Sequence, residues 1–188
     1  MKKQKKSERP KKHTKEFSPK EWKKKYYPIP ADHPSLNKET RASLLKAVDH
    51  SIAKWEGLAS IKVKDLDLGQ LPRLLPPADL QPMTHIENRL GLDIDSLSCA
   101  LCNRISMLCN RCPLYYAQGR VVCGTEYQPN DAFSQFCDAP DIKASSKAAK
   151  KMVKSLKKAR KLAEHPEFPF HAVDISVNKK EQAFLDSL

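Results

Sequence analysis

Apolar residues recur at intervals of three and four positions between Lys38 and Glu56, which predicts an amphipathic helix. The apolar stripe of this segment consists of Leu45, Val48, Ile52 and Trp55. Asn37 before the segment suits a helix start, and Gly57 after it suits a helix end. His50 lies off the stripe, so we expect its side chain to be exposed to solvent.

A second segment with a helical period runs from Ser145 to Glu164, where good helix formers continue up to Pro166. Its apolar stripe is narrow and consists of Ala149, Met152, Val153, Leu156, Ala159 and Ala163. Lysine and arginine residues surround this stripe on both sides. We therefore predict a basic amphipathic helix within residues 141–165.

Shorter patterns predict the remaining elements. Residues 113–117 and 130–137 suit short helices, the first with a proline in its opening turn. The alternating apolar residues of HAVDISV predict a strand at 171–177. Asn178 and Glu181 have the spacing of a capping box, which places a short helix at the C-terminus.

Residues 58–98 show no regular period. The stretch LGQLPRLLPPADLQPM is rich in leucine and proline. Proline excludes a long helix here because it lacks the backbone N–H and clashes with the preceding turn. A structured wrapping loop and a linker both remain open for this segment.

Together these elements predict a mainly α fold: a small α-rich body with an irregular, zinc-stabilised segment and little β structure. Only 40% of the residues are hydrophobic, 30% are charged and 14 are prolines, so the core is modest. We divide the chain into a disordered basic arm at 1–25, an α-rich body at 26–140 with a cysteine-rich zinc module at 98–126, the basic helix at 141–165, and a strand and short helix at 166–188.

The net charge of +12 is concentrated in two segments. Residues 1–25 carry twelve Lys/Arg and three Glu, and residues 143–161 carry nine Lys/Arg and no acid. Each segment therefore has a net charge of +9, which leaves −6 for the rest of the chain. The first segment has few apolar residues, so it cannot bury enough surface to offset the entropy of ordering.

Membrane and secretory signals are not recognisable in the sequence. No apolar run approaches the ~20 residues that span a bilayer. The basic N-terminus lacks the apolar core of a secretory signal. We therefore expect a soluble, intracellular protein with no membrane partner, in a reducing compartment where disulfides rarely persist.

Five of the six cysteines lie within 25 positions, namely Cys99, Cys102, Cys109, Cys112 and Cys123. The first four form two Cys-x-x-Cys pairs. Such a pair presents two sulfurs on one side of a tight turn, and zinc prefers four thiolate or imidazole ligands. The pattern favours a structural Zn²⁺ site, in which metal binding substitutes for a larger hydrophobic core.

Several alternatives for the cysteines remain open. Six residues between the pairs is a short connection, so Cys123 can replace one of the four as a ligand. An iron–sulfur cluster fits thiolate-only ligation and the proline directly after Cys112. Disulfides, a redox pair and core thiols are further alternatives, and we expect Cys137 to be a buried free thiol. Catalytic zinc is disfavoured because no motif such as His-Glu-x-x-His supplies a general base.

The basic segments predict contacts to phosphate. Few lysines of the 145–164 helix have an acidic residue three or four positions away, so they repel one another unless an anion binds. We expect DNA or RNA to bind there non-specifically through its backbone. The residues expected to bind are Lys5, Lys6, Lys11, Lys12, Lys23, Lys24, Lys25, Lys147, Lys150, Lys151, Lys154, Lys157, Lys158, Arg160 and Lys161.

Other interpretations of the basic segments also remain open. A charged helix face can simply be solvated, or it can pack on the acidic body of the same chain. The alternative function is binding to a host or virion protein through the Leu/Pro-rich segment at 66–84. We expect no enzymatic activity, because no cluster of Asp, Glu and His suggests catalysis.

The segments AVDHSIAKWEGL, CALC, CNRCPLYYAQG, CGTEY and EQAFLDSL resemble a family of uncharacterised proteins encoded by tailed bacteriophages. YYPIPAD at 26–32 fits the same family. The matching positions are Trp55, Glu56, Gly57, Leu58, the five clustered cysteines, Pro113, Gly119, Gly124 and Thr125. The resemblance implies a phage origin and a metal-binding cysteine module, but no activity. For a phage protein we expect a location in the host cytoplasm.

The resemblance covers about half of the chain, in separate islands. Gly124 follows Cys123 directly, where the family pattern has one residue between them. Residues 1–25 and 145–164 look like additions to the family pattern. The function of the basic segments therefore has to come from their own chemistry.

Overall fold

The computed structural model describes residues 17–66, 82–124, 131–170 and 179–188, which contain helices and no strand. The α-helices are α1 (Pro19–Tyr26), α2 (Arg41–Ser60), α3 (Pro82–Leu90), α4 (Ala100–Arg104), α5 (Pro113–Ala117), α6 (Ala132–Cys137), α7 (Ile142–Glu164) and α8 (Lys179–Ser187). Three 3₁₀ turns lie at η1 (Pro34–Leu36), η2 (Val63–Asp65) and η3 (Cys109–Arg111). The predicted mainly α fold is confirmed.

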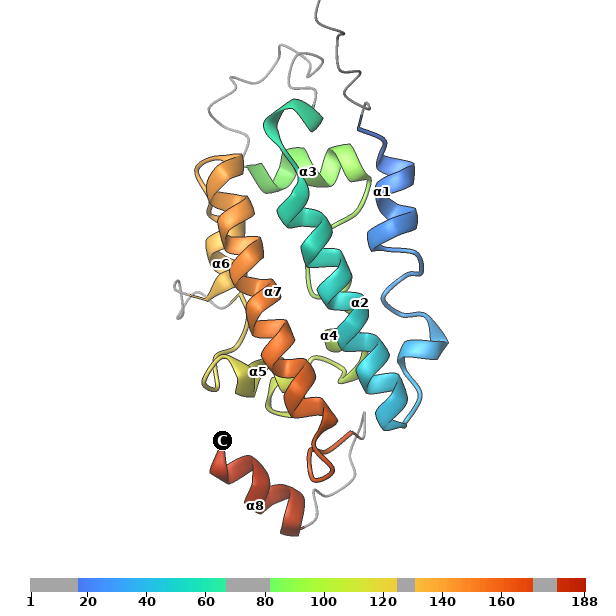
Figure 1. The fold of residues 1–188 in the computed structure, drawn as a ribbon, viewed down its shortest axis with the longest axis vertical. Helices are drawn as coiled ribbons and strands as arrows, with labels where there is room; N and C mark the ends of the chain where they lie inside the picture. The colour runs from blue at the N-terminus through green and yellow to red at the C-terminus, as the bar shows by residue number, and fades with distance from the viewer. Residues whose placement is uncertain (1–16, 67–81, 125–130, 171–178) are drawn as a thin grey trace, which may run out of the picture.

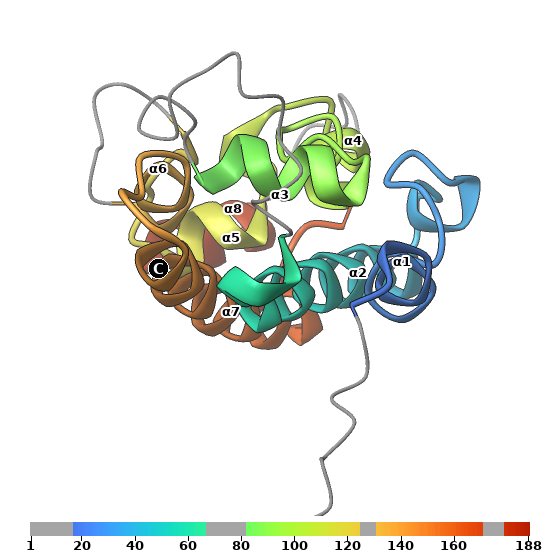
Figure 2. The same ribbon diagram turned by 90° about the horizontal axis from the view of Figure 1, so that it is seen from above.

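The helices form two layers (Figure 1). The long helices α2 and α7 lie side by side, and α1 continues the same layer on the far side of α2. Seen from above, the short helices α3, α4 and α5 cover one side of this layer (Figure 2). The core therefore lies between two long helices and a set of short ones.

The helix α7 buries its narrow apolar stripe in this core. Its buried residues are Ser145, Ala148, Ala149, Met152, Leu156, Ala159 and Ala163. They recur every three or four positions and so lie on one face of the helix. The predicted stripe is confirmed, except that Val153 is only partly buried. Because α7 packs against α2, α5 and α6, it is an integral part of the body.

The helix α2 begins and ends later than its pattern predicts. Thr40 caps it by accepting a hydrogen bond from the Ser43 N–H at 3.1 Å, and the helix continues through Gly57 to Ser60. Its buried residues lie on several faces, because α1, α4 and α7 all pack against it. A single apolar stripe therefore underestimates the burial of this helix.

His50 is buried, so the predicted solvent exposure is wrong. Only 7% of the residue is exposed, and its Nε2 lies 2.8 Å from the carbonyl oxygen of Ile29. The Tyr27 ring packs on the imidazole with centroids 4.8 Å apart. Burial lowers the pKa of His50.

The predicted disorder of residues 1–25 is wrong for residues 19–25, which form most of α1. Ser18 caps this helix by accepting a hydrogen bond from the Glu21 N–H at 3.3 Å. The Trp22 side chain is 4% exposed and packs in the core. One large aromatic side chain therefore anchors a lysine-rich helix. Residues 1–16 lie outside the described part of the chain.

Gly57 lies where α1 crosses α2. A Cβ at this position would meet Trp22 Cζ2 and Tyr26 Cγ at 2.6 Å each. Such distances are shorter than van der Waals contact, so any larger side chain displaces α1. The glycine is required by packing, although it lies inside a helix where glycine is ordinarily unfavourable.

Gly57→Ala is expected to lower the free energy of unfolding by about 1–3 kcal/mol, because overpacking of α1 outweighs the gain in helix propensity. Urea denaturation of the purified variant measures this change. Lys46→Ala, at an exposed position of the same helix, serves as the control and stays within about 0.5 kcal/mol of the wild type. A stabilised Gly57→Ala variant would contradict the packing interpretation.

Arg41, the first residue of α2, holds the C-terminal end of α7. Its guanidinium donates hydrogen bonds of 2.6 to 3.0 Å to the carbonyl oxygens of Ala163, His165, Pro166 and Phe168. These carbonyls include groups that a helix end leaves without partners. The end of α7 is therefore fixed to the start of α2.

Arg104 performs a similar role on α4 and is only 2% exposed. Its guanidinium donates to the carbonyl oxygens of Leu36, Lys38, Thr40 and Phe170 and to the hydroxyl of Ser43. The arginine therefore joins the cysteine-rich segment to the start of α2 and to residue 170.

Three shorter predictions are confirmed. α5 spans Pro113–Ala117 as expected, α6 lies within 130–137 with Asp131 as its cap, and α8 forms near the C-terminus. The predicted strand at 171–177 and most of the Leu/Pro-rich segment, residues 67–81, lie outside the described residues. The 58–98 region does contain α3, which its sequence pattern does not indicate.

Candidate metal centre and basic helix face

All five clustered cysteines line one cavity of about 380 Å³. The first Cys-x-x-Cys pair opens α4, the second spans η3 and the start of α5, and Cys123 follows α5. Cys112 is buried and the other four are partly buried. The structure therefore brings together every residue of the predicted metal site.

Sharp backbone turns direct these cysteines. Ser106 and Met107 have φ angles of 49° and 63°, while Gly119, Arg120 and Gly124 have φ angles of 75°, 66° and 71°. Residues other than glycine rarely adopt this left-handed conformation. Such conformations persist where the surrounding structure requires them, and they concentrate at functional sites.

Two of the sulfurs lie at helix starts. Cys99 is the N-cap residue of α4, and Cys112 is the N-cap residue of α5, directly before Pro113. Backbone N–H groups of Cys102 and Leu101 help to lower the pKa of the Cys99 thiol. At the second helix the N–H groups of Tyr115 and Leu114 act in the same direction on Cys112, but burial outweighs them and raises its pKa. A helix start is a favourable place for a thiolate ligand.

The thiols influence one another strongly. The hydrogen bond between the Cys102 thiol and the Cys99 sulfur lowers the pKa of Cys99 to about 6 and raises the pKa of Cys102. Burial raises the pKa of Cys112, and it raises the pKa of Cys123 to about 12. Burial therefore opposes the loss of the Cys112 and Cys123 protons, which metal binding would have to displace.

Cys137 is separate from this group. It is a partly buried free thiol at the end of α6 and does not line the cavity. Burial raises its pKa to about 11. The expected free thiol is therefore found, but its expected burial is only partial.

A buried lysine faces the same cavity. Lys54 of α2 is 2% exposed, and its Nζ lies 3.0 Å from the carbonyl oxygen and 2.5 Å from the hydroxyl oxygen of Ser98. Burial lowers its pKa, and Cys99 and Asp95 act in the opposite direction. No carboxylate of the described residues forms an ion pair with it. The cavity therefore combines thiols with one buried cation.

The donor set fits a metal that prefers thiolates, such as zinc or iron. A single zinc ion with Zn–S bonds of about 2.3 Å requires sulfurs about 3.8 Å apart. Among the residues that the structure describes, no three His, Cys, Asp or Glu side chains converge closely enough to hold one ion. The thiols surround a volume instead of a point, and the zinc prediction stays a prediction.

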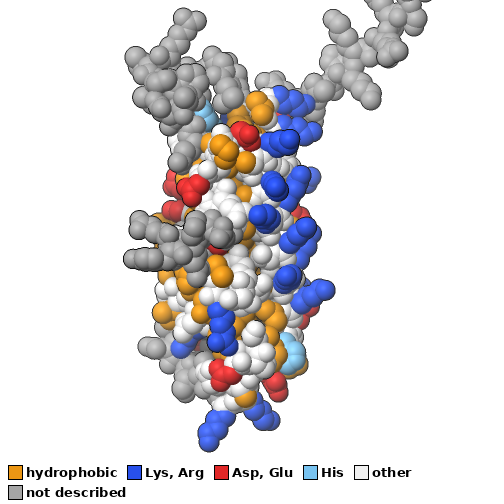
Figure 3. All heavy atoms as spheres, turned by 90° about the vertical axis from the view of Figure 1, so that its left-hand side faces the viewer, with side chains coloured by type: hydrophobic (Ala, Val, Ile, Leu, Met, Phe, Trp, Pro, Cys, Tyr) orange, Lys and Arg blue, Asp and Glu red, His pale blue; other side chains and the backbone are white. Residues whose placement is uncertain are grey.

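Six lysines form a straight row along the exposed side of α7. We call the following residues the lysine row: Lys143, Lys147, Lys150, Lys154, Lys158 and Lys161. All six are exposed. With 100° between successive residues, they fall within an arc of about 80° and extend over about 27 Å. Figure 3 shows lysine and arginine side chains in a column down one long edge of the molecule.

No side chain of the lysine row has a hydrogen bond or ion pair with another described residue. The neighbouring cations of α7 differ in this respect. Lys157 pairs with Glu56 at 2.8 Å, and Lys151 donates to Gln135 Oε1 at 2.6 Å. The cations of α7 therefore fall into two groups. One is the lysine row, and the other, which we call the paired flank, consists of Lys151, Lys157 and Arg160.

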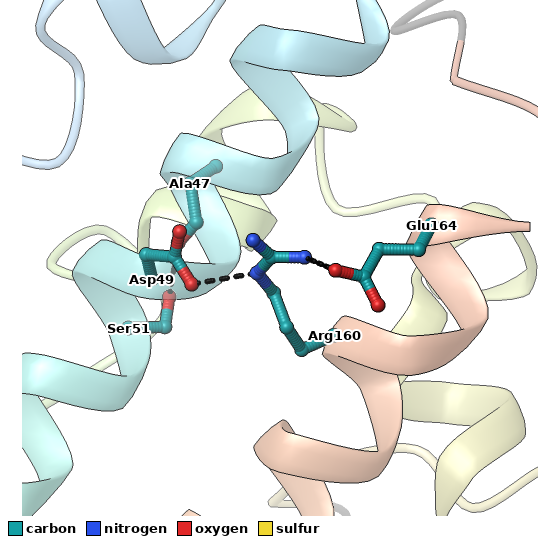
Figure 4. Close-up of polar contacts among 5 residues, drawn as sticks. All are labelled: Ala47, Asp49, Ser51, Arg160 and Glu164. Carbon is teal, nitrogen blue, oxygen red and sulfur yellow. Dashed lines mark hydrogen bonds and ion pairs between the residues drawn. The ribbon is translucent and has the colours of Figure 1, made fainter.

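Arg160 belongs to the paired flank. Its Nε donates to Asp49 Oδ1 of α2 at 2.8 Å, and its Nη1 pairs with Glu164 one turn further along α7 (Figure 4). Both carboxylates raise the pKa of Arg160, the hydrogen bond to Asp49 most strongly. This arginine joins the two long helices and is less available for an external anion.

The predicted lysines of the N-terminal segment have different positions. Lys5, Lys6, Lys11 and Lys12 lie outside the described residues. Lys23 donates to the Gly91 carbonyl oxygen at 2.7 Å, and the Lys25 Nζ lies 4.7 Å from the centroid of the Tyr26 ring. Lys24 is exposed on α1, away from the lysine row.

Two residues of these sites are missed by the sequence prediction. Lys143 belongs to the lysine row, and its spacing of four from Lys147 is the signal that identifies it. Lys54 faces the cysteine cavity. It belongs to a buried stripe of α2 in which successive residues are three or four positions apart: Ala47, Ser51, Lys54 and Leu58. A lysine within a buried stripe is an informative signal.

The helices of the described segments do not include one that is both long and apolar enough to cross a lipid bilayer.

No protein-family model matches this chain, and neither a curated protein nor a solved structure shows significant similarity to it. The resemblance to tailed-phage proteins therefore stays a prediction.

Proposed function

We propose that the protein is a non-enzymatic binding protein that contacts the phosphate backbone of DNA or RNA, without sequence preference, through the lysine row. The observation that supports this most directly is that the row is straight, exposed and unpaired within the described residues. Phosphate is the anion that such a row matches in charge and in spacing.

The dimensions of the row suit a nucleic-acid duplex. B-form DNA carries one negative charge per about 1.7 Å of helix axis, so a straight row of about 27 Å can face several backbone phosphates of the duplex. The six lysines would supply positive charge for these phosphates. Contacts of this kind position a protein on the backbone but do not read the base sequence.

Electrostatic repulsion within the row favours an anionic ligand. Consecutive members are three or four positions apart, and like charges at these spacings destabilise a helix by about 0.2–0.5 kcal/mol per pair. The acids of α2 relieve only the flank, where they bind Lys157 and Arg160. A bound polyanion would relieve the row itself.

A shallow groove of about 620 Å³ adjoins the first half of the row. Lys143, Lys147 and Lys150 line one side of it, and Lys62 lines the other. Asp141 also lines the groove, where its carboxylate caps α7 by accepting from the Ala144 N–H at 2.7 Å. The four lysines would hold a backbone phosphate, and the groove extends the proposed surface beyond α7.

The fold keeps the row rigid. One end of α7 is bound by Arg41, and its apolar face packs on α2 and on α5 of the cysteine module. A rigid row binds with less loss of conformational entropy than lysines on a flexible arm. In this proposal a metal bound by the cysteines stabilises the segment that packs against the buried face of α7, and it catalyses no reaction. The phage origin, the host cytoplasmic location and the alternative protein partner stay predictions.

Fluorescence anisotropy with labelled duplexes of two unrelated sequences tests the proposal. Both are expected to bind with dissociation constants of about 10⁻⁴ to 10⁻⁶ M at physiological salt, and with similar affinity. Plasmid DNA incubated with the protein and Mg²⁺ or Mn²⁺ should stay intact. Failure to bind either duplex at low salt, or specific cleavage of the plasmid, would contradict the proposed function.

A further inference from the structure

The cavity lined by the five cysteines has the properties of a site for a group larger than one ion. Its volume is about 380 Å³, whereas the sulfurs of a tetrahedral zinc site enclose almost no space. The described His, Cys, Asp and Glu side chains do not converge in threes on any single point. The thiols are directed into one space from three segments of the chain.

The walls of this cavity are largely apolar. Trp55 and Phe133 meet there edge to face with ring centroids 6.1 Å apart, and Met152 and Leu156 of α7 are both about 1% exposed. Such walls exclude water from a bound group. Burial of this kind is typical of protein-bound iron–sulfur clusters, in which it tunes the reduction potential.

Charge in the cavity also points to an anionic group. Lys54 is buried beside Ser98 and lines the cavity together with Asp95, but it forms no ion pair with a described carboxylate. Thiolates of a bound metal group would place further negative charge close to its ammonium group. The Gln118 side-chain amide, 3.5 Å from the sulfur of Cys123, is a further donor to that sulfur.

One of the five thiols lies at the rim. The Cys109 thiol donates to the carbonyl oxygen of Met107 at 3.6 Å in an exposed position. Cys99, Cys102, Cys112 and Cys123, which line the same cavity, are then the remaining four thiols. Four thiolates are the usual ligand set of an iron–sulfur cluster, and a proline directly after a ligand cysteine also occurs in ferredoxins.

We propose that Cys99, Cys102, Cys112 and Cys123 bind a [4Fe–4S] cluster, with Lys54 as its buried counter-charge and Cys109 outside the ligand set. The proposed cluster site shares no residue with the lysine row, because the cavity lies on the buried side of α7. The four thiols lose their protons on binding, and the cluster supplies no chemistry to the function proposed above.

Metal and sulfide analysis of the full chain tests this proposal. The protein is purified under anaerobic conditions from cells grown with both iron and zinc. About four iron and four acid-labile sulfide per chain, with broad visible absorption, are expected. One zinc per chain without sulfide would overturn the proposal, and so would a folded, metal-free protein whose six thiols all react with an alkylating agent.

Two single substitutions identify the ligands. Cys109→Ser is expected to retain the iron, the sulfide and the visible absorption, whereas Cys123→Ser is expected to lose most of all three. Cys137→Ser, outside the cavity, is the matched control. Loss of the cluster in Cys109→Ser would overturn the ligand assignment. If Cys123→Ser does not fold, electron paramagnetic resonance of the reduced wild-type protein decides between a [4Fe–4S] cluster and any other centre.

Discussion

Replacing Lys147, Lys150 and Lys154 together by glutamine is expected to reduce the affinity for duplex DNA by about two to three orders of magnitude at 0.1 M salt. Each lysine that neutralises a phosphate releases close to one counterion, and at this salt concentration each release contributes almost a factor of ten to the association constant. Anisotropy titrations of the variant and the wild type measure the ratio. The fold should be unaffected, because all three side chains are exposed and lack partners among the described residues.

The matched control removes the same number of charges elsewhere. Lys38, Lys46 and Lys64 are exposed and lie outside the lysine row. Their joint replacement by glutamine lowers the net charge by the same amount as the lysine-row variant. The comparison therefore separates the effect of direct phosphate contacts from that of long-range electrostatic attraction. We expect this control to weaken binding by less than about ten-fold. Equal losses in the two variants would show that total charge, and not the row on α7, determines binding.

Arg104→Met is expected to lower the free energy of unfolding by about 3–5 kcal/mol, because several buried carbonyl oxygens lose a charged hydrogen-bond donor together. Methionine keeps most of the volume but donates no hydrogen bond. The carbonyl oxygens of Leu36 and Lys38, now 3.0 and 2.5 Å from the guanidinium, would lose this donor. Each buried acceptor left without a partner costs about 1–3 kcal/mol.

Urea denaturation followed by circular dichroism measures this loss. Arg111→Met is the control, because Arg111 lies in the same cysteine module and is more exposed. We expect it to change the stability by no more than about 0.5 kcal/mol. Arg104→Lys, which keeps the charge without the guanidinium fork, should lie between the two. If Arg104→Met were no more costly than Arg111→Met, the carbonyl network would not be what joins α4 to α2.

The helices with a strong period could be predicted because their burial is simple. α7 faces the core with one narrow stripe, so its positions and its exposed lysines follow from spacing alone. α1 could not be predicted, because its lysine-rich sequence is ordered by aromatic side chains, chiefly Trp22 with Tyr26, that pack on a distant glycine. The sequence pattern predicts a helix end at Gly57, but α2 continues past it. The glycine is needed there because α1 packs closely against it, which the sequence around Gly57 does not show.

The candidate sites were predictable to different degrees. The cysteine spacing identifies all five residues that line the cavity, but spacing does not reveal the size of the space between them. The basic composition of 143–161 indicates an anion-binding helix, but only tertiary structure shows that Asp49 and Glu56 pair with part of it. The role of Lys54 depends equally on a contact between distant segments.

The cysteine cavity and the lysine row lie on opposite faces of α7. α5, which follows the second Cys-x-x-Cys pair, packs against α7, and Met152 and Leu156 of α7 line the cysteine cavity. Any group bound by the cysteines would therefore stiffen the helix that carries the lysine row. Loss of that group should weaken DNA binding indirectly, through a less rigid α7.

The salt dependence of DNA binding tests the central claim most directly. With six phosphate contacts, the logarithm of the association constant should fall linearly against the logarithm of salt concentration with a slope of about −5 or steeper. The same plot for the Lys147, Lys150 and Lys154 triple variant should be less steep by about three. A wild-type slope near zero, or an unchanged slope in the variant, would contradict the claim that the lysine row binds the phosphate backbone.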